Sequence, residues 1–266
     1  MARALITGAS SGIGEQFAYA LARQHYDLIL VARRAQRLQA IAQEALRLGA
    51  PSAAVHALDL SHRDAPAWLH TQVSTENATL DLLVNNAGFG TQGELMALPL
   101  ERELEQIELN VCALVATSRL FLPAMVAAGR GTIINVASTA AFQPVPYMAT
   151  YAATKAFVLN FSLAVAQEVA ASGVQVMALC PGLTRTEFQA VAGTERRWLP
   201  TFLYMDARVV AEQALRAATR GRRLYVNGPF NRLGTMLVRL TPLGVVTRAT
   251  SLLFRPGRPA RGARLP

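Results

Sequence analysis

Tyr151 and Lys155 stand four residues apart in a stretch whose pattern predicts a helix over 150–171. On a helix this spacing puts both side chains on one face, about one turn apart. A tyrosine hydroxyl has a pKa of roughly 10, and a nearby ammonium group is expected to lower that pKa by stabilising the phenolate. Tyr151 could therefore act as a general acid that protonates a carbonyl oxygen, or as a general base in the reverse oxidation.

Most tyrosine–lysine pairs at this spacing belong to an ordinary helix surface, so the spacing alone is weak evidence. Two further observations support a catalytic role for this pair. Lys155 is the only lysine in a chain that otherwise uses arginine, which suggests a role for a compact ammonium on a flexible stem. Ser138 follows a predicted strand over 131–137, so its hydroxyl could hydrogen-bond a substrate oxygen and stabilise negative charge there. Thr139 is an adjacent alternative for this role, and a loop serine without function is the simpler interpretation.

A glycine-rich turn, TGASSGIG at 7–14, directly follows the first predicted strand and opens a predicted helix over 13–24. Glycines let the chain turn sharply and let its backbone approach a pyrophosphate closely. The start of the helix adds unpaired N–H groups and the positive end of a dipole. The spacing after a strand predicts a dinucleotide-binding loop, although a plain glycine turn has the same composition. The predicted contact residues are Gly8, Ser10, Ser11, Gly12, Ile13 and Gly14.

The second predicted strand, 27–32, indicates which nicotinamide dinucleotide fits. In Rossmann domains a carboxylate at the end of this strand binds the ribose 2′-hydroxyl of NAD. Here the strand runs into Arg33 and Arg34, and a guanidinium pairs with the 2′-phosphate of NADP through charge-assisted hydrogen bonds. Arg33 is the better candidate, since Arg34 could equally begin a solvated helix. Ser10 and Ser11 could add hydroxyl contacts, so the predicted cofactor is NADP(H).

Short apolar segments alternate with helical patterns, which is the signature of βαβ units and a parallel sheet. The sequence therefore predicts an α/β protein: a single-domain Rossmann fold with a doubly wound, mostly parallel seven-stranded sheet and helices on both faces. Asp206 and Gly221 are predicted to start and stop the last of the helices. The predicted strands are 4–7, 27–32, 53–58, 80–85, 131–137, 174–180 and 224–227, and the predicted helices are 13–24, 34–48, 63–75, 100–127, 150–171 and 207–219.

TGASSGIG at 7–14, NNAG at 85–88, Ser138 and the Tyr-x-x-x-Lys of 151–155 together resemble the short-chain dehydrogenase/reductase family, from about residue 3 to residue 187. The resemblance implies a fourth catalytic residue, Asn110, which would hold a water that relays protons to Lys155. It also implies that Lys155 hydrogen-bonds the nicotinamide ribose. The other cofactor contacts that it implies are Asp59 and Leu60 at the adenine, Asn86, Ala87 and Gly88 after the fourth strand, and Pro181, Gly182 and Thr184 after the sixth, with Thr186 as the alternative to Thr184 at the carboxamide.

Simpler interpretations exist for two of these residues. Asp59 could be a residue at a helix N-terminus, and Asn110 could be an ordinary polar helix residue. The resemblance also implies a homodimer or homotetramer formed through the helices near 100–127 and 150–171.

Apolar residues mark a predicted lid over about 183–205 and the loop between Ser138 and Tyr151. They predict an apolar ketone or aldehyde as substrate, such as an acyl or steroid-like molecule, although the same side chains could simply pack the lid onto the core. The lid residues are Phe188, Val191, Trp198, Leu199, Phe202, Leu203 and Tyr204, and the loop residues are Phe142, Pro144, Val145, Tyr147 and Met148.

The composition sets limits on location and partners. The chain has 266 residues, 52% of them hydrophobic, and a formal charge of +9, but its basic residues form no compact run, which argues against nucleic acid. Two isolated cysteines and an N-terminus too short for a signal peptide predict a reducing compartment, the cytoplasm. No run of 18 apolar residues suggests a spanning helix, and no metal site is predicted.

The segment 231–266 extends beyond the predicted catalytic domain, 1–230. Its apolar residues and spaced arginines are typical of an interfacial helix on an anionic membrane, and also of a helix docked on its own domain or on a partner subunit. The function predicted is an NADPH-dependent oxidoreductase that interconverts a carbonyl and an alcohol. The alternatives are a non-catalytic NADPH-binding sensor and a protein associated with a membrane surface.

Overall fold

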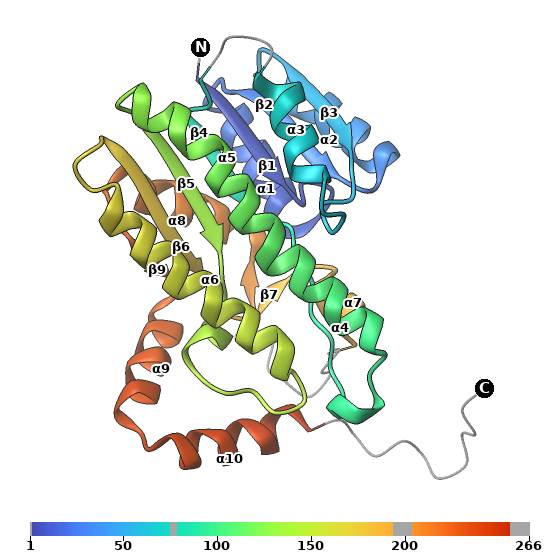
Figure 1. The fold of residues 1–266 in the computed structure, drawn as a ribbon, viewed down its shortest axis with the longest axis vertical. Helices are drawn as coiled ribbons and strands as arrows, with labels where there is room; N and C mark the ends of the chain where they lie inside the picture. The colour runs from blue at the N-terminus through green and yellow to red at the C-terminus, as the bar shows by residue number, and fades with distance from the viewer. Residues whose placement is uncertain (1, 75–78, 194–203, 256–266) are drawn as a thin grey trace.

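Seven strands form one parallel sheet in the computed structural model, which describes residues 2–74, 79–193 and 204–255 (Figure 1). The strand order is β3-β2-β1-β4-β5-β6-β9, and every neighbouring pair is parallel. This confirms the predicted doubly wound sheet. The strands are β1 (Arg3–Thr7), β2 (Asp27–Ala32), β3 (Ala53–Ala57), β4 (Leu82–Asn85), β5 (Gly131–Val136), β6 (Val174–Cys180) and β9 (Leu224–Val226).

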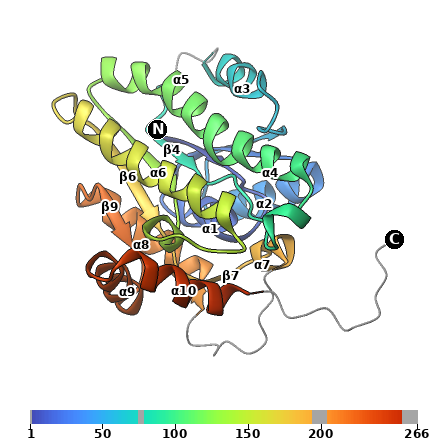
Figure 2. The same ribbon diagram turned by 60° about the horizontal axis from the view of Figure 1, so that its bottom comes forward.

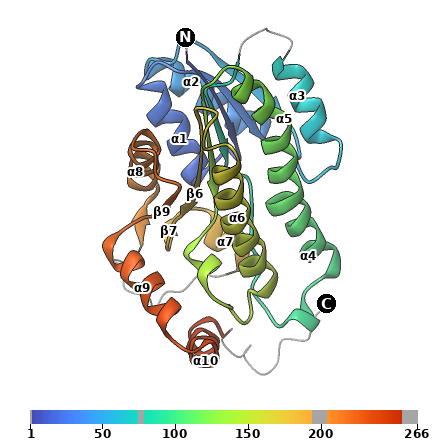
Figure 3. The same ribbon diagram turned by 60° about the vertical axis from the view of Figure 1, so that its left-hand side comes forward.

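Helices cover both faces of the sheet because successive side chains of each strand point to opposite sides. On β1, Ala4 and Ile6 join the apolar core on one face, and Leu5 joins the core on the other. Figure 3 shows α1 and α8 on one side of the strands and α3, α5 and α6 on the other. The first face is covered by α1 (Gly12–Ala22), α2 (Ala35–Arg47) and α8 (Ala207–Thr219), and the second by α3 (Ala65–Ser74), α5 (Ala113–Ala127) and α6 (Ala149–Glu168).

The helix predicted over 100–127 is interrupted in the structure. It consists of α4 (Leu100–Ile107), a π-helical turn η2 (Glu108–Cys112) and α5. A π turn holds an extra residue, and periodicity alone could not show it because the apolar pattern continues through it. The turn contains Asn110, which is 1% exposed.

α8, the last helix that covers the sheet, begins and ends at the residues that the sequence predicted. Asp206 caps α8 by accepting a hydrogen bond from the Arg208 amide at 2.7 Å, and Gly221 follows the helix with a φ of +67°. The remaining short elements are η1 (Leu95–Ala97), η3 (Thr139–Phe142), β7 (Thr184–Arg185), α7 (Phe188–Ala192) and β8 (Met205–Asp206), of which β7 and β8 pair in parallel.

Within the described residues, the continuous helical stretch Leu100–Ala127 is long and apolar enough to cross a membrane by length and composition, which differs from the expectation from the sequence. The contacts of this stretch are those of a helix that covers a sheet. Phe121 and Met125 lie in the core beneath it, and Thr117 donates a hydrogen bond to the Asn85 Oδ1 atom at 2.8 Å. Its apolar composition therefore includes the residues that pack on the strands.

Buried polar side chains link the centre of the sheet to α5 and α6. The Asn85 amide donates to Asn135 Oδ1 at 2.9 Å and to Ser118 Oγ at 3.0 Å. Thr117 donates to Asn85, and the Asn135 amide donates to Ser162 Oγ at 2.9 Å. A buried polar group without a hydrogen-bond partner lowers the stability of the fold. These bonds therefore hold β4, β5, α5 and α6 in one fixed arrangement.

Replacing Asn135 by alanine is expected to lower the free energy of unfolding by about 2 kcal/mol, because it takes a partner from the buried Asn85 amide and from Ser162. Urea unfolding followed by circular dichroism measures the change. Asn160→Ala is the matched control, since Asn160 is exposed and donates only to the Ala156 carbonyl of its own helix. Equal losses in both variants would show that the buried network contributes nothing specific.

Two helices follow the sheet layers at the C-terminal end of the chain. α9 (Pro229–Leu240) and α10 (Leu243–Phe254) lie at the bottom of Figure 1, beyond the carboxyl ends of the strands. Figure 2 turns this end forward and shows both helices outermost. The predicted boundary at residue 230 falls inside α9, and α10 returns to the catalytic domain, as described below.

Candidate active site

The glycine turn lies where the strand order reverses, because β1 has β2 on one side and β4 on the other. Open α/β sheets bind ligands at this position. Gly8 and Gly12 have φ values of +66° and +59°, which residues with a side chain rarely adopt. A Cβ atom on Gly14 would stand 2.3 Å from the Gly8 carbonyl oxygen, and one on Gly8 would stand 2.8 Å from the Ala87 Cα atom. Glycine is therefore required at these positions.

Asn86 holds the glycine turn in place. Its side-chain amide donates to the carbonyl oxygens of Thr7 and Gly8 at 3.0 and 3.2 Å. The Thr7 hydroxyl in turn accepts from the backbone amides of Asn86 and Ala87, both at 3.0 Å. The NNAG segment thus ties the end of β4 to the end of β1, while Gly88 lies against Asn110 and Lys155.

These residues fit a dinucleotide. The first backbone amides of a helix have no hydrogen-bond partner within the helix. α1 begins at Gly12, and the Ser11 side chain at the N-cap position makes no capping hydrogen bond to α1. A cavity of about 410 Å³ opens beside this turn, lined by Ser11, Gly12, Thr186 and Glu187 among others. A pyrophosphate at the start of α1 would meet backbone amides and a positive dipole end.

The two threonines after β6 occupy different places. Thr184 is buried and donates to the Gly182 carbonyl at 3.0 Å. Thr186 lies against Gly12, where an added Cβ would come within 2.9 Å of its methyl group. Thr186 is therefore next to the phosphate turn. Pro181 accepts a hydrogen bond from the Thr139 amide at 2.9 Å and joins this segment to the end of β5.

Arg33 and Asp59 meet beside the ends of β2 and β3. The Arg33 guanidinium lies 3.4 Å from Asp59 and 3.3 Å from Glu105. Burial alone would raise the pKa of Asp59, but hydrogen bonds from the backbone and side chain of Ser61, together with Arg33, bring that pKa below its usual value. Asp59 lies in a turn before α3 and not at a helix N-terminus. Leu60 is buried in the adjoining core.

Arg34 contacts the glycine turn. Its guanidinium donates to the Ser10 hydroxyl and to the Ser10 carbonyl at 3.2 Å. It also pairs with Glu187 of the lid at 2.8 Å, and this hydrogen bond is the main reason that the pKa of Glu187 lies below its usual value. Arg34 is also the exposed N-cap residue of α2, as the simple interpretation predicts, so it both begins a solvated helix and contacts the glycine turn.

Tyr151, Ser138 and Lys155 come together at the ends of β5 and β6. Tyr151 and Lys155 share one face of α6 as predicted, and both are nearly inaccessible. Ser138 begins η3, where its hydroxyl accepts from the Ala140 amide at 3.1 Å. Thr139 is the next residue and belongs to η3 itself.

The electrostatics differ from the expectation that an ammonium lowers the tyrosine pKa. Burial raises the pKa of Tyr151 to about 12, a hydrogen bond with Ser138 opposes this shift, and Cys180 adds to it. Burial also lowers the pKa of Lys155 to about 8. The Lys155 ammonium lies 5.9 Å from the centre of the tyrosine ring and donates to the Val136 carbonyl at 2.8 Å. Burial outweighs the charge in this arrangement, so Tyr151 keeps its proton.

Asn110 is positioned by the π turn. Its side-chain amide donates to the Phe89 carbonyl at 2.9 Å and to Thr154 at 3.1 Å, and its oxygen accepts from the Phe89 amide. Thr154 donates to the Tyr151 carbonyl. Both the amide nitrogen and the oxygen of the Asn110 side chain are hydrogen-bonded, so Asn110 fixes the loop after β4 against α6. Asn110 is thus a buried polar residue of the helical stretch, held by hydrogen bonds within the protein, and its catalytic role stays a prediction.

Three residues at the site were not expected from the sequence. The buried Cys180 accepts from the Ser138 amide, and burial raises the pKa of its thiol to about 12. A Cβ atom on Gly90 would meet the Phe188 and Tyr151 rings at about 3 Å. Phe254, at the end of α10, packs against the buried group that contains Tyr151. The GFG that follows NNA was a signal for Gly90, whereas no local pattern indicated Phe254.

An apolar wall surrounds the tyrosine. The Phe188 and Tyr151 rings lie 5.2 Å apart, and Val145 and Met148 are buried beside them. Phe188 of the predicted lid and the loop before α6 therefore both contribute to this wall. Trp198, Leu199, Phe202 and Leu203 lie outside the described residues.

A family model described as short chain dehydrogenase matches residues 2–197. The chain belongs to the short-chain dehydrogenase family. Its fold agrees with this membership, and members of the family bind a nicotinamide cofactor and a small-molecule substrate. The protein is thus an oxidoreductase of the dehydrogenase/reductase type.

Three proteins illustrate the similarity of this short-chain dehydrogenase to known ones. An uncharacterized oxidoreductase of Myxococcus xanthus is 36% identical over 70% of this chain and 74% of its own length. A very-long-chain 3-oxoacyl-CoA reductase of Laccaria bicolor is 35% identical over 65% of this chain, which spans about half (52%) of that enzyme. A solved structure, a short-chain dehydrogenase from Sphingobium yanoikuyae in complex with NADPH, has a TM-score of 0.81 at 31% identity and covers 98% of this chain and 99% of its own.

Proposed function

We propose that this enzyme reduces an apolar ketone or aldehyde to the alcohol with NADPH, and that Tyr151 is the proton donor. One observation carries the proposal. A buried tyrosine hydroxyl is hydrogen-bonded to Ser138. Ser138 follows β5 at the same carboxyl edge of the sheet as the glycine turn after β1, and the tyrosine ring packs against an apolar wall that includes Phe188. A non-catalytic sensor would need the cofactor turn but not a tyrosine held in this way.

The residues divide the chemistry between them. Bound NADPH would supply the hydride to the carbonyl carbon. Tyr151 holds its proton at neutral pH, because its pKa is about 12, and donates it to the carbonyl oxygen. The Ser138 hydroxyl orients the same oxygen and stabilises the negative charge that develops on it. Lys155, mostly protonated at neutral pH with a pKa of about 8, stabilises the phenolate that remains until a proton returns from solvent.

The preference for NADPH rests on two arginines. Arg33 stands at the end of β2 with weak, exposed ion pairs, which it can exchange for a phosphate at little cost. Arg34 joins Ser10 to the lid through Glu187. The Sphingobium yanoikuyae enzyme, solved with NADPH, supports this assignment.

An apolar substrate is favoured by the wall around Tyr151 and by the Laccaria bicolor relative, whose name specifies a very long acyl chain. With a series of straight-chain ketones and NADPH, kcat/KM is expected to rise roughly fourfold for each buried methylene. Loss of NADPH absorbance measures the rate. Phe254→Ala should flatten the series, and Phe230→Ala, an exposed phenylalanine on α9, should not. A flat series with the native chain would refute the apolar pocket.

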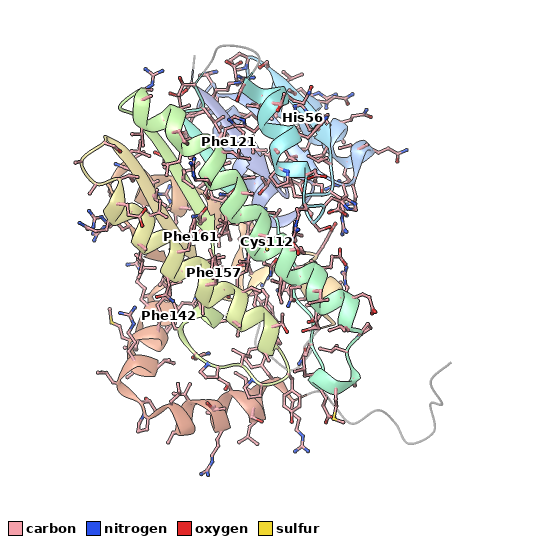
Figure 4. All side chains as sticks on the ribbon, in the orientation of Figure 1. His56, Cys112, Phe121, Phe142, Phe157 and Phe161 are labelled. Atoms are coloured by element: carbon pink, nitrogen blue, oxygen red, sulfur yellow. The ribbon has the colours of Figure 1, made fainter. Side chains whose placement is uncertain are left out.

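A homo-oligomer through α4 and α6 is part of the same proposal. Leu100, Leu104 and Ile107 on α4 are exposed, as is Phe157 on α6. Phe157 stacks on Phe161 of the same helix with ring centres 5.8 Å apart, and Figure 4 labels both on α6. Apolar side chains gathered on neighbouring helices form a suitable surface for a second copy.

A further inference from the structure

α9 has an apolar stripe on the side that faces away from the protein. Its inner side is attached to the domain: Asn231 donates to the Asn227 carbonyl at 2.7 Å, and Thr235 is buried. The outer side carries large apolar residues at i, i+3, i+6, i+7 and i+10, which lie along one face of a helix. Their exposure runs from 54% for Leu237 to 83% for Leu240. The stripe consists of Phe230, Leu233, Met236, Leu237 and Leu240.

α10 continues this surface. Val246 and Thr250 are buried, and Thr250 donates to the Pro144 carbonyl at 3.0 Å. Leu243, Val245 and Leu252 on the same helix are exposed. We call the exposed residues of both helices the C-terminal apolar face, and Figure 2 shows its two helices outermost at this end of the molecule.

The charged residues of α9 and α10 all have the same sign. No aspartate or glutamate follows Glu212 in the sequence, whereas arginines recur to the end of the chain. Arg232 and Arg239 are held at the rim, over the rings of Tyr225 and Phe142 at 4.8 and 5.3 Å. Arg248 on α10 and Arg255 directly after it are exposed.

We propose that the C-terminal apolar face binds the surface of an anionic phospholipid membrane. Apolar side chains that enter the acyl boundary, with arginines that meet the headgroups, are what such a surface binds. A second copy of the same face is a poorer partner, because a two-fold contact would bring arginines against arginines. If the proposed function holds, binding would also place the apolar wall at Phe254 next to the lipid in which an apolar substrate dissolves.

Flotation of the full chain with vesicles tests the proposal. The chain is expected to bind vesicles of phosphatidylcholine and phosphatidylglycerol, and to bind phosphatidylcholine alone more weakly. Leu233→Gln with Leu240→Gln should weaken binding at least about tenfold, because two large side chains no longer leave water. Leu46→Gln with Val209→Gln is the matched control, since both residues are exposed but lie on α2 and α8. Arg248→Gln with Arg255→Gln should remove the preference for the anionic vesicles.

The outcomes separate this proposal from the proposed function. Without vesicles, the Leu233/Leu240 variant and the Leu46/Val209 variant should both turn over a water-soluble ketone at the rate of the native chain. Equal rates also show that both variants fold. Failure of the native chain to bind either vesicle, or equal binding by the Leu233/Leu240 variant, would overturn the membrane proposal whatever the turnover. A third outcome is that the native chain self-associates and binds no vesicles, while the Leu233/Leu240 variant does not self-associate. The face would then be an interface between copies, and the membrane proposal would also be overturned.

Discussion

Replacing Tyr151 by phenylalanine is expected to lower the rate of carbonyl reduction by a factor of about 10² to 10⁴, the usual contribution of a positioned general acid. The ring stays in contact with Phe188 and the apolar wall, so only the proton and the hydrogen bond with Ser138 are lost. NADPH affinity should be unchanged. Single-turnover rates with saturating NADPH, and a fluorescence titration of the cofactor, measure the two quantities.

The reverse reaction supplies the control for this prediction. Oxidation needs the phenolate, and the pKa of Tyr151 is about 12. The rate of alcohol oxidation by the native enzyme should therefore rise with pH across the range in which the protein stays folded. Tyr151→Phe should lose this rise. Near-native reduction by the variant would mean that another group donates the proton, and the catalytic assignment would then be wrong.

Arg33→Ala is expected to weaken NADPH binding by about tenfold to 100-fold, which corresponds to a hydrogen bond to a charged group. Binding of NADH should change by less than about twofold, because NADH lacks the 2′-phosphate. The guanidinium is free to make this contact, since its pairs with Asp59 and Glu105 are exposed and 3.3–3.4 Å long. Calorimetric titration with each cofactor measures the ratio of the two affinities.

A second arginine, at the other end of α2, controls for charge alone. Arg47 lies at the far end of α2, 78% exposed, with a single pair to Glu44. Arg47→Ala removes the same charge without removing a contact at the cofactor, so both affinities should stay as they are. Arg33→Ala that weakened NADPH and NADH equally would show that Arg33 shapes the adenine site and does not select the phosphate.

Much of the fold and the site could be predicted from the sequence, because the signals are local. The strands are short apolar runs, and they form one seven-stranded parallel sheet as predicted. The glycine turn depends on φ values that Gly8 and Gly12 can adopt without strain. Tyr151 and Lys155 share a face because four residues make about one helical turn.

Tertiary structure decided the properties that depend on distant neighbours. The pKa of Tyr151 is raised because the loop before α6, the lid and α10 bury its hydroxyl, and no spacing within α6 reports that burial. The π turn that turns Asn110 inward is invisible to periodicity, because the apolar pattern runs through it. Asn86 is predicted to border the cofactor, and only the tertiary structure shows that its side chain also ties β4 to the glycine turn after β1.

The C-terminal helices show the same division. The sequence determined that they are apolar and basic, which left a membrane, a partner subunit and the protein's own domain as possible contacts. Folding used one side of each helix: Thr235 and Thr250 are buried, and Phe254 packs against the tyrosine cluster. The other side of each helix is exposed. Composition determines how much apolar surface a segment has, but only packing against the rest of the chain decides which part of that surface remains available for a partner.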